Sequence, residues 1–148
     1  MADPLVLLAA LVPWIELRGS IPLGIATGLG PAVVLAVSIV LNIIVFFPVW
    51  AVLDVLYKRI ENWRAVRWAT RKALKHKPSV DRWGVPGLAL FVAVPLPFTG
   101  AYTATLLAWL LRMPWRRAFV AIAAGVVAAG LIIFALSLGV LNGLMLLA

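Results

Sequence analysis

The sequence predicts an all-α integral membrane protein with two re-entrant helical hairpins, each followed by a full transmembrane helix, and a basic amphipathic helix between the halves. Composition is the first reason, because 65% of the 148 residues are hydrophobic and 12% are charged, against about 25% charged in a soluble domain. The second is that all but one of the 13 Lys and Arg residues lie in two short segments. The third is that Pro and Gly interrupt an apolar stretch in each half.

We expect one membrane domain over the whole chain. Its parts are a first repeat, the basic helix and a second repeat, and the boundaries follow the changes in charge and hydropathy. The expected ranges are residues 1–148 for the domain, 4–56 for the first repeat, 57–82 for the basic helix and 83–147 for the second repeat.

The first hairpin is expected at the start of the chain. Residues 4–15 are an apolar run, about 18 Å long as a helix, which is roughly half the ~30 Å hydrocarbon core. Gly19 and Pro22 disfavour a helix, so we expect a turn over residues 16–22 and a short return. The alternative is one unbroken span over residues 4–27.

The first full span is expected over residues 31–56. Pro31 is suited to open a helix. Asn42 lies within the span, and we expect it to hydrogen-bond a neighbouring helix, as polar residues in membrane helices commonly do. Pro48 is expected to kink the span.

Residues 57–82 hold most of the positive charge. Apolar residues at helical spacing on one side and cations largely opposite predict a helix lying on anionic lipid headgroups. The alternative is a solvated loop. Because the net charge of +8 is confined to segments flanking apolar stretches, we expect membrane lipids as partners and no nucleic acid. The side chains expected at the membrane surface are Lys58, Arg59, Arg64, Arg67, Arg71, Lys72 and Lys75.

The second hairpin is expected over residues 83–111, which carry no charged side chain. Their length suits one crossing, but Pro95, Pro97 and Gly100 interrupt the middle. A crossing would place the arginines of residues 112–117 opposite the main basic segment, whereas a hairpin keeps all these cations on one side. The positive-inside rule favours the hairpin, so both basic segments are expected in the cytoplasm.

The second full span is expected over residues 115–147, where Gly125 and Gly130 suit close helix packing. Each half then contains a broken hairpin followed by a span. The first hairpin would enter the membrane from outside and the second from inside, which makes the halves an inverted repeat. Inverted repeats with broken helices near the membrane midplane are a recurrent plan of transporters.

Glu16 and Arg18 are the only ionisable residues between positions 4 and 53, and such residues inside a membrane are costly and often functional. The Arg18 guanidinium suits a phosphate or carboxylate. Burial favours protonated Glu16 and the nearby cation favours its carboxylate, so Glu16 is a candidate proton carrier. Alternatively, the two satisfy only each other and nearby freed backbone groups. The expected substrate- or proton-binding residues are Glu16, Arg18, Gly19, Pro22, Pro95, Pro97, Thr99, Gly100, Tyr102 and Thr103.

Two stretches are distinctive: Glu16-Leu17-Arg18-Gly19-Ser20-Ile21-Pro22 and Phe91-Val92-Ala93-Val94-Pro95-Leu96-Pro97-Phe98-Thr99-Gly100-Ala101-Tyr102. With the surrounding spans, they resemble the small multidrug export family over nearly the whole chain. That family is similar to the DedA-like lipid translocases in having two re-entrant hairpins. The resemblance implies a transporter or flippase that moves an amphiphilic substrate, such as a lipid phosphate or a lipophilic drug.

The alternative function is a non-transporting membrane organiser that docks through its basic helix. An enzyme is not expected, because no Ser/His/Asp set or carboxylate cluster is present, and neither a cofactor nor a metal is expected. Two spans and two hairpins are little material to enclose a path, so we expect a homodimer or higher homo-oligomer. The expected location is the cell membrane.

Overall fold

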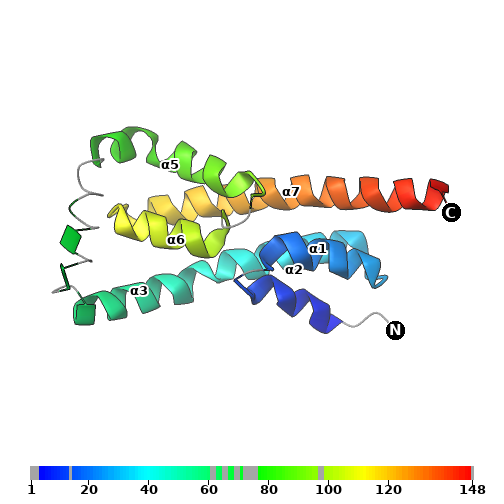
Figure 1. The fold of residues 1–148 in the computed structure, drawn as a ribbon, viewed down its shortest axis with the longest axis horizontal. Coiled ribbons are helices and arrows are strands. Elements are labelled where there is room, and N and C mark those ends of the chain that lie inside the picture. The colour runs from blue at the N-terminus through cyan, green and yellow to red at the C-terminus, as the bar shows by residue number, and fades with distance from the viewer. Residues whose placement is uncertain are drawn as a thin grey trace.

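The computed structural model describes residues 4–13, 15–60, 63–64, 67–68, 71, 77–96 and 99–147. Within these residues, all regular structure is helical. Figure 1 shows an elongated molecule in which η1 begins and α7 ends at one extremity, while α3 ends and α5 begins at the other. The elements are the 3-10 helix η1 (Pro4–Leu11) and the α-helices α1 (Glu16–Ala26), α2 (Pro31–Ile44), α3 (Phe46–Ile60), α5 (Lys77–Ala93), α6 (Ala101–Leu110) and α7 (Trp115–Leu147).

Two helical hairpins extend into the molecule from opposite ends. η1 and α1 run in opposite directions from one end, and α5 and α6 do so from the other (Figure 1). Both hairpins turn near the middle of the molecule. The long helix α7 runs beside them and contacts α1, α2, α5 and α6. The two turns are thereby brought against each other.

Two helical stretches are long and apolar enough to cross a membrane: Pro31–Tyr57, formed by α2 and α3, and Trp115–Val140 in α7. At ~1.5 Å per residue each is about 40 Å long, more than the ~30 Å hydrocarbon core. Both predicted spans are therefore present as helices. The predicted interruption of the first lies at Val45, three residues before Pro48, whose ring prevents a hydrogen bond to the Ile44 carbonyl.

The first turn lies earlier than the sequence predicts. η1 ends at Leu11 and Glu16 already begins α1, so the expected turn over residues 16–22 is wrong. Gly19 does not break the helix. A Cβ at Gly19 would lie 2.2 Å from Ile15 Cγ2, so the glycine allows a close side-chain contact within a continuous helix.

Pro22 lies inside α1 and does not hold a turn open. A proline there removes one helical hydrogen bond, to the Arg18 carbonyl, which usually costs about 3 kcal/mol or more in a helix interior. The contacts of α1 with η1, α2 and α7 outweigh this loss, as tertiary packing often outweighs propensity. The break between η1 and α1 also contradicts an unbroken helix over residues 4–27.

The second interruption is confirmed. α5 ends at Ala93 and α6 begins at Ala101, and Pro95 lies between them. α5 begins at Lys77, earlier than predicted, with Pro78 as its second residue. Proline is favoured there because the first N–H groups of a helix have no helical partner.

The predicted basic helix over residues 57–82 overlaps a neighbouring helix at each end. α3 continues to Ile60, and α5 already begins at Lys77. Lys58 and Arg59 belong to α3. Lys72 and Lys75 lie outside the described residues, and so does much of the segment between the helices. The described side chains within it are exposed and are those of Trp63, Arg64, Arg67, Trp68 and Arg71.

Two glycines let α7 pack closely on two different helices, as predicted. A Cβ at Gly125 would lie 2.6 Å from the Ala89 carbonyl oxygen and 2.6 Å from Val92 Cβ, both on α5. A Cβ at Gly130 would lie 2.9 Å from Ile39 Cγ1 on α2. The neighbours differ, so the two glycines do not form one continuous interface.

Gly125→Ala is expected to lower the thermal unfolding midpoint of the purified protein in detergent, because the α5 backbone would have to move away. Overpacking of this kind costs about 1–3 kcal/mol. The matched control is Gly139→Ala on the same helix, where a Cβ would meet nothing within 4 Å. The control should be neutral or stabilising, because alanine favours a helix over glycine by about 1 kcal/mol. Equal losses in both variants would contradict the packing argument.

Candidate functional site

The turns of the two hairpins meet through the side chain of Glu16. Its φ of 45° lies in the left-handed region, which costs a non-glycine residue about 1–2 kcal/mol. The buried carboxylate accepts hydrogen bonds from the backbone N–H groups of Ala101 and Tyr102, the first residues of α6. A carboxylate is stabilised there by unpaired N–H groups and by the helix dipole. Glu16 of the first hairpin therefore caps a helix of the second.

Gly100 makes room for this carboxylate. A Cβ at Gly100 would lie 1.6 Å from Glu16 Oε2 and 2.2 Å from Oε1. The Gly100 backbone is extended, with φ −93° and ψ −172°, a conformation open to every residue. Lack of space, rather than backbone conformation, therefore requires glycine at this position.

Arg18 makes a second connection between the hairpins. Its Nη2 donates a hydrogen bond to Thr99 Oγ1 at 2.7 Å. The Thr99 hydroxyl lies 2.7 Å from the carbonyl oxygen of Val94 and 2.8 Å from that of Leu96, and donates to them. Both carbonyls lie beyond the last helical residue of α5. The hydroxyl thus accepts from Arg18 and donates within its own turn, which ties the turn to α1.

Thr99→Val is expected to lower the thermal unfolding midpoint, because it removes the partner of the Arg18 guanidinium and the hydroxyl that binds the turn carbonyls. A hydrogen bond to a charged group contributes about 1.5–3 kcal/mol. Thr99→Ser keeps the hydroxyl and should retain most of the stability. Thermal unfolding of both variants in detergent checks this, and a Thr99→Val variant as stable as the wild type would contradict the role of the hydroxyl.

Tyr102, in the second hairpin, contacts the first hairpin. Its hydroxyl donates a hydrogen bond to the carbonyl oxygen of Leu11, the last residue of η1. Carbonyls at a helix end lack a partner within the helix. Each hairpin therefore satisfies backbone groups that the break in the other leaves free. Thr103 differs, because its hydroxyl donates to the Gly100 carbonyl at 3.1 Å, within its own hairpin.

The structure brings only some of the predicted site residues together. Gly19 and Pro22 lie within α1, Pro95 lies in the second turn, and Pro97 lies outside the described residues. No hydrogen bond joins Glu16 to Arg18 in the described part of the chain, although the two opposite charges lie near enough to attract each other. Glu16 does satisfy freed backbone groups, as the alternative to a binding role stated. The predicted residues at the contact are Glu16, Arg18, Thr99, Gly100 and Tyr102.

Three further polar side chains are fully buried beside the first hairpin. Asn42 Nδ2 donates to the Ala10 carbonyl of η1 at 3.1 Å, which confirms its predicted interhelical hydrogen bond. Ser20 of α1 donates to Ser38 of α2 at 3.0 Å. This serine pair was not predicted from the sequence. Its signal was that Ser38 lies one helical turn before Asn42, so both side chains share a face of the span.

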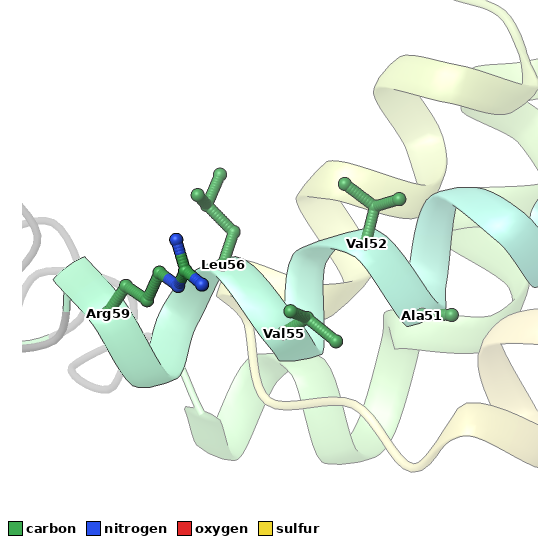
Figure 2. A pocket seen from close by; sticks show the side chains of 5 residues that line it. All are labelled: Ala51, Val52, Val55, Leu56 and Arg59. Carbon is green, nitrogen blue, oxygen red and sulfur yellow. The ribbon is translucent and has the colours of Figure 1, made fainter.

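A shallow groove runs along the exposed face of α3 (Figure 2), lined by Ala51, Val52, Val55, Leu56 and Arg59. An apolar helix face that ends in an arginine suits the boundary between lipid tails and headgroups. A second hollow is lined by Arg64, Arg67, Trp68 and Arg71. In the described residues, no three His, Asp or Glu side chains are grouped so that they could hold a metal ion.

Two helices long enough to cross a bilayer and two broken hairpins joined by a charged contact indicate an all-helical membrane protein. A family model described as "Putative small multi-drug export protein" matches residues 16–132. The match covers most of the chain, from α1 through the second turn and into α7, so the chain belongs to this family, as predicted. The description suggests export of drugs as the function. Neither a curated protein nor a solved structure matches the chain significantly.

Proposed function

We propose that the protein is a membrane transporter or flippase that moves an amphiphilic substrate, either a lipid phosphate or a lipophilic drug, through the contact between the hairpin turns. The observation that carries this proposal is that Glu16 of the first hairpin binds the start of α6 in the second hairpin, while Arg18 binds Thr99 in the turn before α6. Broken helices that meet at a charged contact recur at transporter binding sites. The family description supports export in general.

The contact suggests how a proton and an anionic substrate group exchange. The start of α6 and the Arg18 guanidinium together form an anion site, which the Glu16 carboxylate fills. Protonation of Glu16 removes its charge and weakens its hold on the N–H groups of Ala101 and Tyr102. A phosphate or carboxylate of the substrate then takes its place beside Arg18. Loss of the proton restores the Glu16 cap and expels the substrate.

The proposal includes a membrane arrangement. The two hairpins are re-entrant and enter from opposite faces, so the halves form an inverted repeat of the DedA-like type. The ends of α3 and α6 lie on the cytoplasmic side of the cell membrane, where the basic residues contact anionic lipids. Two copies or more enclose the path, and no enzymatic step takes place.

Purified protein in liposomes tests the proposal. Two probes represent the two substrate classes: phosphatidylglycerol with a fluorescent headgroup, whose flip is read by an impermeant quencher, and ethidium, whose uptake is read by DNA trapped inside. We expect at least one probe to move faster than in liposomes holding an unrelated helical membrane protein. If both probes move no faster than in these control liposomes, the result would contradict transport. It would favour the non-transporting organiser, which docks through the exposed arginines.

A further inference from the structure

The Arg112 guanidinium lies over two aromatic rings, those of Tyr57 and Trp109, near the C-terminal end of α6. We call this pair of rings the Tyr57–Trp109 corner. The rings of Tyr57 on α3 and Trp109 on α6 meet edge to face, with centroids 5.1 Å apart and planes at 69°. The Arg112 guanidinium carbon lies 4.5 Å from the Tyr57 centroid and 5.8 Å from the Trp109 centroid. Aromatic faces attract cations at these distances through the ring quadrupole.

Asp54 adds a negative charge to this corner. Trp109 Nε1 donates a hydrogen bond to Asp54 Oδ1 at 2.7 Å, which fixes the orientation of the indole ring. Trp109 is buried, whereas Tyr57 is half-buried and Asp54 and Arg112 are exposed, so the corner opens at the protein surface. Two aromatic faces beside a carboxylate form an environment that attracts organic cations.

The backbone at Arg112 indicates that its side chain has a role beyond the turn. α6 ends in a Schellman motif, in which Met113 N–H donates to the Ala108 carbonyl and Arg112 N–H to the Trp109 carbonyl, both at 3.0 Å. Arg112 occupies the left-handed position with φ 54°, where glycine is usual and any other residue costs about 1–2 kcal/mol. Glycine would complete the turn equally well, whereas arginine also fills the aromatic corner.

We propose that the Tyr57–Trp109 corner is a binding site for a quaternary ammonium group, and that the Arg112 guanidinium occupies it in this conformation as an internal competitor. A quaternary ammonium group has a positive charge but no N–H donor, so aromatic faces are its natural partners. Free amphiphilic cations and the choline headgroups of lipids both carry one. The corner is about 15 Å along α6 from the Glu16 contact. It goes beyond the proposed transport site and does not depend on it.

Equilibrium dialysis of the full chain in nonionic detergent against radiolabelled tetraethylammonium tests the proposal. Arg112→Gln removes the competitor and should tighten binding by about 2- to 30-fold, the range of cation–π contributions. Arg117→Gln removes one positive charge from the same end of the molecule and is the matched control. Arg112→Gly suits the left-handed backbone and should bind as Arg112→Gln does, which guards against misfolding of the glutamine variant.

Tyr57→Leu in the Arg112→Gln background should return binding to the wild-type level or below. Equal effects of Arg112→Gln and Arg117→Gln would overturn the proposal, because general electrostatics would then explain the gain. Binding insensitive to Tyr57→Leu would also overturn it. Competition by short-chain phosphatidylcholine, but not by phosphatidylglycerol, would identify a lipid headgroup as the source of the quaternary ammonium group. If neither lipid competes, the source is a free cation. Because no transport is measured, failure here leaves the Glu16 proposal standing.

Discussion

Glu16→Gln is expected to abolish the flux of whichever probe the wild-type protein moves in liposomes, while the protein stays folded. The glutamine amide oxygen can still accept from the N–H groups of Ala101 and Tyr102, so the hairpins remain joined. Loss of the charge at the helix start costs about 0.3–2 kcal/mol, which is small beside the total stability of a folded domain. Glutamine cannot take up and release a proton, so the exchange between substrate and side chain stops.

Flux in liposomes and the thermal unfolding midpoint in detergent together check this expectation. Asp81→Asn is the matched control, because it makes the same carboxylate-to-amide change in α5, far along that helix from the turn. We expect its flux to equal that of the wild type. Flux retained in Glu16→Gln would rule out the proton role, and loss of flux with loss of folding would assign Glu16 to structure alone.

Gly100→Ala is expected to separate the hairpin turns. The added Cβ would overlap the Glu16 carboxylate, which would have to leave the start of α6. The backbone N–H groups of Ala101 and Tyr102 would then lose their acceptor. Each buried group left unpaired costs about 1–3 kcal/mol. We expect a lower unfolding midpoint and a loss of flux. Gly87→Ala on α5 is the control, because a Cβ there meets nothing within 4 Å.

A double-mutant cycle shows whether Gly100→Ala acts through the carboxylate. In a Glu16→Ala background there is no carboxylate to displace, so adding Gly100→Ala should cost little more. The coupling between the two changes should therefore be large, as it is for residues in direct contact. Additive losses of stability would mean that Gly100 is required for a reason other than space for Glu16.

Hydropathy and the positions of Pro and Gly predicted the two spans and the second break. The apolar lengths of residues 31–56 and 115–147 indicated two spans, and both are helices of sufficient length. Pro95 and Gly100 indicated the second break, which is present. The interhelical bond of Asn42 was also predicted. These features depend on local composition, which a single sequence displays directly.

Features that depend on contacts between distant residues were not predictable in the same way. The turn before Glu16 was placed too late because Gly19 and Pro22 usually break helices, yet here α1 continues through both under tertiary contacts. The partners of Glu16 and Arg18 lie in the other hairpin, at Ala101, Tyr102 and Thr99. The sequence analysis placed Thr99, Gly100 and Tyr102 in one site with Glu16 and Arg18, but sequence spacing could not show which backbone groups the charged pair would bind.

The left-handed backbone of Arg112 was likewise not predictable from residue type, since glycine is the usual signal for that position. The chain gives no glycine there, and the interaction that offsets the strain involves Tyr57 on α3. Strain of this kind becomes visible only once the partner helix is placed. Such positions are frequently functional, which is why this one supports a binding proposal.

The arrangement of the hairpins in the membrane is the central claim, and labelling of single cysteines tests it most directly. The chain has no cysteine, so Gly30→Cys, Ser79→Cys, Pro114→Cys and Leu147→Cys need no altered background. In intact cells and inverted vesicles, an impermeant thiol reagent should reach positions 79 and 114 from the cytoplasmic side and positions 30 and 147 from the other. Labelling of 79 and 114 from opposite sides would make α5 and α6 a plain crossing and contradict the inverted repeat.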